Sequence, residues 1–172
     1  MIMRPGQQLL LPANPVFIGM SLIAALLLNM LPLGRAPWMP DFLALVLVFW
    51  SVHQPLRVGI GLAFMFGVVM DVHQSALLGQ HALAYTALSF FAITIHRRLL
   101  WFTVPSQAAQ VLPLFFAAHA IEVAIRLLAG GTFPGLTALL APAIEALLWP
   151  VASVILLAPQ RRAPNPDENR PL

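Results

Sequence analysis

The sequence predicts an all-α integral membrane protein, folded as a bundle of six transmembrane helices with a short second helix. The first observation behind this prediction is composition: of 172 residues, 60% are hydrophobic and 9% are charged. A soluble domain carries about 25% charged residues. The second is that the apolar residues gather in six tracts, at residues 15–33, 41–52, 56–72, 76–95, 104–128 and 136–158.

The lengths of the tracts predict how many of them cross a bilayer. A helix rises about 1.5 Å per residue, so about 20 residues span the hydrocarbon layer. Five tracts reach or approach that length. Tract 41–52 would extend only about 18 Å as a helix, which leaves two alternatives for it: a short span, helped by the flanking Trp38 and Trp50, or a re-entrant half-helix.

The arginines favour six crossings with both termini in the cytoplasm. In that topology nearly all of them lie inside, as the positive-inside rule expects: Arg4, Arg57, Arg97, Arg98, Arg161, Arg162 and Arg170, with only Arg35 and Arg126 outside. If tract 41–52 did not cross, Arg4 would lie on the side opposite to Arg97, Arg98, Arg161 and Arg162. We therefore expect a multi-pass protein of the bacterial inner membrane.

Three regions follow along the chain. Residues 1–14 form a cytoplasmic N-terminal segment, residues 15–158 the transmembrane domain, and residues 159–172 a polar, proline-rich tail that we expect to be disordered and cytoplasmic. The first tract lacks a small-residue cleavage site, so it is interpreted as a retained span rather than a signal peptide.

The sequence offers no pattern typical of an enzyme or a metal site. It has no cysteine, and its histidines and carboxylates lack the spacing of helical metal ligands. No phosphate-binding glycine loop or nucleophile elbow occurs. The arginines flank apolar tracts, which indicates membrane topology rather than nucleic-acid binding. We expect no enzyme activity, cofactor, metal or nucleic-acid partner.

Two carboxylates are expected on the outer side. Asp41 follows Pro40 and opens a tract, as a helix N-cap does. Asp71 ends the third tract, where it either faces a protein surface or caps the turn into the next helix through amides near Ser75 and Ala76. Both acids are structural caps or, together with His73, part of a partner-binding patch or polar pocket.

Two further acids lie within apolar tracts, where an ionised group at the bilayer centre costs about 2.5–3.5 kcal/mol. Glu122 has Arg126 one turn later and His119 almost one turn earlier, so a neutralising Glu122–Arg126 pair is expected; the alternative is contact with a second membrane protein. Glu145 has no companion in its own helix, so it is expected to face another helix or to be protonated.

Small residues predict where helices pack closely. Gly59, Ala63 and Gly67 form a ridge at four-residue steps that ends at Asp71, and Gly79 opens a similar face on the following helix. Together with Pro40, these are the predicted helix-packing positions. At the opposite edge, "HRRLLWF" carries Arg97, Arg98 and Trp101, which we interpret as a cytoplasmic interface: a topology anchor or a docking patch.

Several motifs carry a family resemblance. They are "WMPDFLALVLVFW", "WSVHQPLRVGIGLAFMFGVVMDVHQSALLGQHALAY", "HRRLLWF" and "LLAGGTFPG". With them, most of the chain resembles the rod shape-determining protein MreD family of Gram-negative bacteria. The positions that match the family pattern are Pro40, Asp41, Gly67, Asp71 and Gly79; Glu122, Arg126 and Glu145 lie outside it.

The resemblance implies a function and partners. It implies a non-enzymatic inner-membrane scaffold of the rod/elongation complex, which binds MreC and works with MreB, RodA and the elongation transpeptidase to direct lateral peptidoglycan synthesis. It also implies a fold similar to the membrane substrate-binding subunit of energy-coupling-factor transporters. The alternative function is a small-solute-binding transporter subunit, in which Asp41, Asp71, His73 and Gln74 line a binding mouth.

Overall fold

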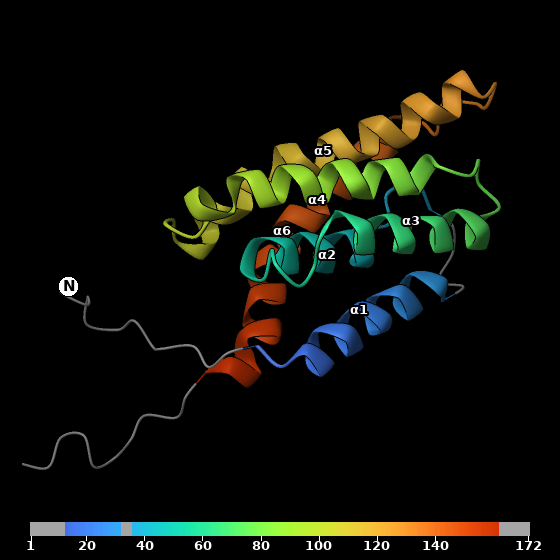
Figure 1. Cartoon of the computed structure of the whole chain (residues 1–172). Coiled ribbons are helices and arrows are strands. Elements are labelled where there is room, and N and C mark those ends of the chain that lie inside the picture. Colours follow the sequence, from blue (N-terminus) through green and yellow to red (C-terminus); the bar gives the residue numbers. More distant parts are fainter. Residues whose placement is uncertain (1–12, 32–35, 162–172) are drawn as a thin grey trace, which may run out of the picture.

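A computed structural model describes residues 13–31 and 36–161, and the secondary-structure elements that it contains are helices joined by turns (Figure 1). The predicted all-α class is confirmed. The elements in chain order are α1 (Pro15–Met30), α2 (Phe42–His53), α3 (Ile60–Gln74), α4 (Gln80–Leu99), α5 (Val104–Leu128), the 3-10 helix η1 (Leu136–Leu139), α6 (Leu140–Leu157) and the 3-10 helix η2 (Ala158–Gln160). Most of the two predicted terminal segments lies outside the described residues, although η2 extends the last helix into the expected tail.

The short helix α2 is the centre of the bundle. Nine of its 12 residues are buried, and it packs against α1, α4 and α6. Trp50, expected as a flank of the apolar tract, is instead fully buried, and its indole N–H donates to the hydroxyl of Ser21 on α1 at 2.8 Å. Other helices surround α2 on most sides, which explains why it is apolar all round.

Successive helices run in opposite directions, and polar contacts between their ends fix this order. Asn29 at the end of α1 meets Asp41 at the start of α2, and Asp71 at the end of α3 meets His81 at the start of α4. At the other end of the bundle, the Arg57 guanidinium in the α2–α3 connection donates to the carbonyl of Ala13, which precedes α1. In Figure 1, α1 begins and α6 ends on this same side.

Helices α3 and α4 each begin four residues later than expected. Residues 54–58 form turns, and Gly59 is the N-cap of α3. Leu56 is apolar but 100% exposed, so it belongs to a connection rather than to a buried helix face. Before α4, Ser75 and Gly79 adopt left-handed backbone conformations with φ of 51° and 105°. Such a conformation is easy for glycine and ends regular helix.

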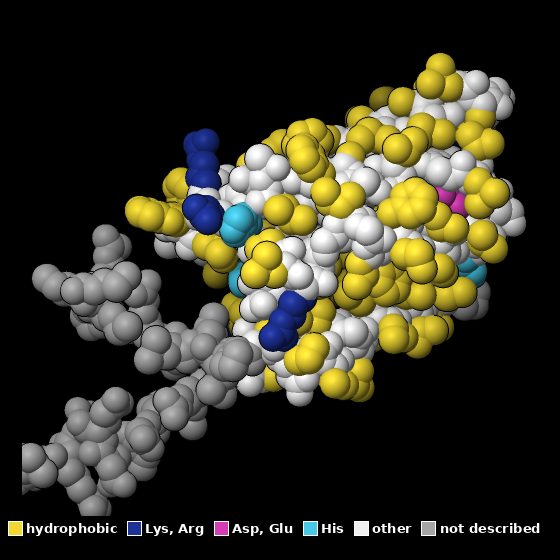
Figure 2. All heavy atoms as spheres, viewed as in Figure 1, with side chains coloured by type: hydrophobic (Ala, Val, Ile, Leu, Met, Phe, Trp, Pro, Cys, Tyr) yellow, Lys and Arg dark blue, Asp and Glu magenta, His cyan; other side chains and the backbone are white. Residues whose placement is uncertain are grey.

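The outer surface is largely apolar (Figure 2). Large exposed hydrophobic side chains occur on several helices, among them Met20, Ile23, Phe64, Met65, Phe90, Leu147 and Val151. The segments Val104–Leu128 and Leu136–Gln160 are long and apolar enough to cross a membrane, and α1, α2 and α3 are shorter apolar helices. An apolar surface this extensive suits contact with lipid rather than water.

Candidate functional site: a polar cavity at one end of the bundle

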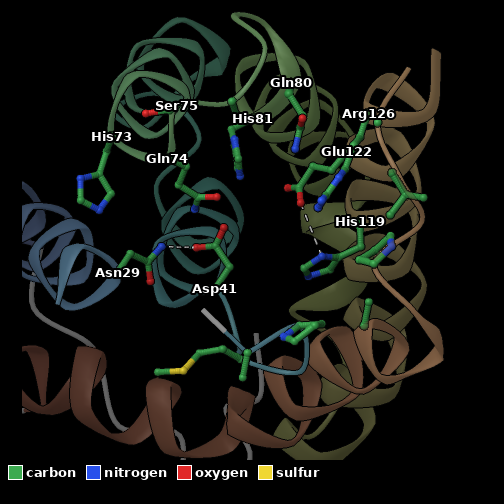
Figure 3. Close-up of a pocket in the computed structure, with 18 of the residues that line it drawn as sticks. Asn29, Asp41, His73, Gln74, Ser75, Gln80, His81, His119, Glu122 and Arg126 are labelled. Carbon is green, nitrogen blue, oxygen red and sulfur yellow. Dashed lines mark hydrogen bonds and ion pairs between the residues drawn. The ribbon is translucent and has the colours of Figure 1, made fainter. Parts of the chain in front are cut away.

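A cavity of about 980 Å³ opens at the end of the bundle where α1, α3 and α5 finish and α2 and α4 begin (Figure 3). Asn29 and Asp41 lie on one side of it, and His119, Glu122 and Arg126 lie on the other. Further polar lining residues are His73, Gln74, Ser75, Gln80 and His81. A chain that is poor in charged residues therefore concentrates its polar side chains around one cavity.

Asp41 holds three helices together. Its Oδ1 accepts hydrogen bonds from the backbone N–H of Ala44 (2.9 Å), as an N-cap does, and from Asn29 Nδ2 on α1 (2.6 Å). Its Oδ2 accepts from the hydroxyl of Tyr85 on α4. Asn29 completes the cap, because its Oδ1 accepts from the N–H of Phe42 at 3.0 Å. The predicted N-cap at Asp41 is thus present, with added partners from α1 and α4.

Glu145 finds its partners on other helices, as expected. The Oε1 atom of this fully buried carboxylate lies 2.8 Å from the backbone nitrogen of Asp41 and 2.8 Å from His119 Nε2 on α5. Its Oε2 atom has no hydrogen-bond partner within the described residues. Glu145 therefore joins the start of α6 to the start of α2 and to the middle of α5.

The expected Glu122–Arg126 ion pair is not formed among the described residues. Glu122 Oε2 instead lies 3.6 Å from His119 Nδ1, so His119 stands between two carboxylates. Arg126 is in the exposed last turn of α5, and its backbone carbonyl accepts a hydrogen bond from Gly131 at 2.9 Å. The half-buried His119 is the charged partner within reach of Glu122. Helical spacing alone did not predict this, because His119 and Arg126 both lie about one turn from Glu122.

Asp71, in the last turn of α3, caps the start of the neighbouring helix α4, whose own N-cap residue is Gly79. Its Oδ1 accepts from the backbone N–H of His81 (2.7 Å) and lies 2.8 Å from His81 Nδ1. Its Oδ2 accepts from the N–H groups of Gly79 (2.8 Å) and Ala82 (3.3 Å). The idea of a cap on α4 is right, but the donors are not the amides near Ser75 and Ala76. Asp71 is fully buried and does not line the cavity, so the two carboxylates do not share one mouth.

Only some of the predicted packing positions are sites where two helices approach closely. Ala63 and Gly67 are buried, and a Cβ atom built at Gly67 would stand 2.4 Å from Ala82 Cα on α4. Gly59 and Gly79, in contrast, have open space around the position of a Cβ, so they are not sites of close helix approach. Gly79 serves the left-handed turn and donates to Asp71, while Pro40 lines the cavity beside Asp41.

The remaining predicted residues have few contacts. His73 is half-buried at the cavity, and its side chain makes no hydrogen bond in the described part of the chain. Arg97, Arg98 and Trp101 are exposed at the opposite end of the bundle. The prediction missed Asn29, although a lone asparagine inside an apolar tract was the available signal.

The comparisons give the family. The sequence matches the family described as rod shape-determining protein MreD over residues 12–160. It is 25% identical over 135 residues to a rod shape-determining protein MreD of Haemophilus influenzae, covering 76% of this chain and 81% of that protein. No solved structure matches, so the expected likeness to a transporter subunit stays a prediction. With a match over most of its length, the chain belongs to the rod shape-determining protein MreD family, a family of membrane proteins.

Proposed function

We propose that this chain is a non-enzymatic scaffold of the rod/elongation complex, with MreC as its direct partner and MreB, RodA and the elongation transpeptidase as further members. Its role would be to couple the cytoskeleton to lateral peptidoglycan synthesis. Family membership supports a role in determining rod shape.

The observation that carries the proposal is that the buried acids bind backbone groups at the starts of helices. Asp41, Asp71 and Glu145 all bind backbone N–H groups at the starts of helices. The contacts of Asp71 and Glu145 each join two helices, and the carboxylate of Asp41 also accepts from Asn29 on α1 and Tyr85 on α4. The acids therefore fix how the helices lie relative to one another. A scaffold needs such rigidity, because a partner must meet the same surface each time.

The membrane topology is part of the proposal. The alternation of helix directions supports six crossings, including α2, with both ends of the chain in the cytoplasm. Arg57, Arg97 and Arg98 lie at one end of the bundle, and the acids lie at the other. Figure 2 shows the basic and acidic side chains on opposite sides of the molecule. By the positive-inside rule the arginine end faces the cytoplasm and the cavity faces outward.

Depletion and co-purification test the proposed function. Cells of a rod-shaped host that lose this chain should round up, and tagged chain extracted in mild detergent should recover MreC. A Gly61→Ala variant is a suitable positive control, because a Cβ there meets no atom within 4 Å. Rod growth without the chain, together with no recovery of MreC, would rule the function out.

A second candidate function is a small-solute-binding subunit of a transporter, and the cavity favours it. Its volume of about 980 Å³ lies near the upper end of the usual range for ligand pockets, about 300–1,000 Å³. A thermal-shift screen of vitamins and cell-wall precursors on purified chain tests this candidate. A saturable shift that Gln80→Leu abolishes would support it, since Gln80 lines the cavity without capping a helix.

A further inference from the structure

The end of the bundle opposite the polar cavity has a hollow of about 340 Å³, lined by Arg97, Arg98, Trp101 and Phe102. The two arginines belong to the last turn of α4, and the two aromatic residues follow in the turn after it. Arginines at a helix C-terminus are favoured by the helix dipole. The dipole does not explain why aromatic side chains share a hollow with them.

No other described residue covers the arginine or aromatic side chains of this hollow completely. Trp101 is 89% exposed and Phe102 is 43% exposed. Within residues 13–31 and 36–161, neither Arg97 nor Arg98 forms an ion pair. An aromatic side chain of this exposure and two adjacent guanidinium groups together suit a ligand with an anionic head and an apolar body.

The distribution of charge favours an anionic occupant. The described acids are Asp41, Asp71, Glu122 and Glu145, and all of them belong to the network around the polar cavity at the other end. The arginine end holds Arg57, Arg97, Arg98 and Arg161 with no described carboxylate to balance them. Among the described residues, the charge of this end is therefore complementary to a phosphate-rich surface.

We propose that this hollow is a binding site for an anionic phospholipid with two phosphate groups, of the cardiolipin type. Two adjacent guanidinium groups match two phosphates, because each can bind one phosphate through paired N–H donors. Trp101 and Phe102 then contact the glycerol and the upper acyl chains. Basic pockets at the cytoplasmic ends of transmembrane helices are suited to this class of headgroup.

The site requires only that the arginine end lie at the lipid headgroups, and it does not depend on MreC or on a role in cell shape. A failure of the lipid experiment would therefore leave the proposed function standing, and the reverse is also true. The apolar residues Leu99 and Leu100 lie between the arginines and Trp101 in sequence, with Leu99 fully buried. The turn that carries the site is thus anchored in the protein core.

Native mass spectrometry of the purified full chain with added lipids tests the proposal. Cardiolipin should bind in preference to phosphatidylglycerol, and phosphatidylglycerol in preference to phosphatidylethanolamine. The double substitution Arg97→Gln with Arg98→Gln should weaken cardiolipin binding at least about tenfold, since each basic side chain near an anionic surface contributes about a factor of five. The substitution Arg97→Lys with Arg98→Lys should keep part of the binding, which also shows that the site tolerates substitution.

Two matched controls make the result specific. Arg161→Gln removes a charge at the same end outside the hollow, and Arg126→Gln removes one at the opposite end; both should bind cardiolipin like the unmodified chain. Fluorescence quenching by cardiolipin brominated near its headgroup should fall when Trp101 is replaced by Phe. Equal losses in the Arg161 and Arg97/Arg98 variants, equal binding of all three lipids, or quenching unchanged by Trp101→Phe would each overturn the proposal.

Discussion

Gly67 on α3 and Ala82 on α4 lie in direct backbone contact: a Cβ atom added at Gly67 would stand 2.4 Å from Ala82 Cα and 2.6 Å from Ala82 N. The carboxylate of Asp71 accepts hydrogen bonds from the N–H groups of Ala82, of its neighbour His81 and of Gly79. The close approach at Gly67 therefore brings the start of α4 within reach of a carboxylate one turn further along α3. The small residue and the buried acid belong to one structural unit.

Substitution of Gly67 tests that unit. We expect Gly67→Ala to destabilise the protein by about 1–3 kcal/mol, because the backbone of α4 cannot move aside as a flexible side chain would. The measurement is thermal or denaturant unfolding of the purified chain in detergent. Gly61→Ala is the control in the same helix, where open space surrounds the added Cβ and the stability should rise by about 0.5–1 kcal/mol. Equal stability of the two variants would contradict the contact.

Asp71→Leu should destabilise the protein by more than about 3 kcal/mol, because buried N–H groups of α4 would lose their acceptor at about 1–3 kcal/mol each. Membrane insertion should survive, since leucine is more favourable than aspartate in a helix that crosses a bilayer. The assay compares the amount of chain in the membrane fraction with its unfolding temperature and its recovery of MreC. His73→Leu, at a half-buried position without a side-chain hydrogen bond in the described chain, is the control.

The sequence predicts a helix well where residues next to its ends mark the boundaries, as in α5. That helix spans Val104–Leu128, as expected, because Pro105 suits a first turn and Gly130 follows the end of the apolar run. The starts of α3 and α4 were placed too early, because apolar residues such as Leu56 belong to connections there. Hydrophobicity alone does not separate a helix from an apolar turn.

The sequence predicts which residues form the site, but it does not predict which residues form contacts with one another there. Asp41, Asp71, Glu122 and Glu145 stand out because acids are costly in lipid. Their partners come from elsewhere in the chain, as with Glu145 and the backbone of Asp41, which are 104 positions apart. Within one helix, spacing favoured Arg126 as the partner of Glu122, while the contact is with His119. Periodicity describes neighbours on a helix but carries no information about contacts between helices.

The shared acceptor Asp41 predicts coupling between two distant donors. Asn29 and Tyr85 both donate to its carboxylate, and a hydrogen bond to a charged group contributes about 1.5–3 kcal/mol. We expect Asn29→Ala and Tyr85→Phe each to lower the free energy of unfolding by an amount of this order. In the double variant the losses should depart from additivity by about 0.5–3 kcal/mol, because both act on one group.

Thr86→Val provides the control for this cycle. The Thr86 hydroxyl donates to the carbonyl of Ala82 in its own helix, so its loss should change stability by no more than about 0.5 kcal/mol. The measurement is the same unfolding assay on the single and double variants. Additive losses within error would show that Asn29 and Tyr85 do not act through a common acceptor.

The crossing of α2 can be tested directly, because the chain has no cysteine and each introduced thiol is the only one present. Trp38 precedes α2 and is 49% exposed, whereas Leu56 follows it and is 100% exposed. If α2 crosses the membrane, Trp38→Cys should react with a membrane-impermeant maleimide in intact spheroplasts, and Leu56→Cys should react only after permeabilisation. Gln74→Cys, exposed at the end of α3, should behave like Trp38→Cys. Labelling of Trp38→Cys and Leu56→Cys from the same side would mean that α2 is re-entrant, and it would place Trp38 on the same side of the membrane as Arg57, Arg97 and Arg98.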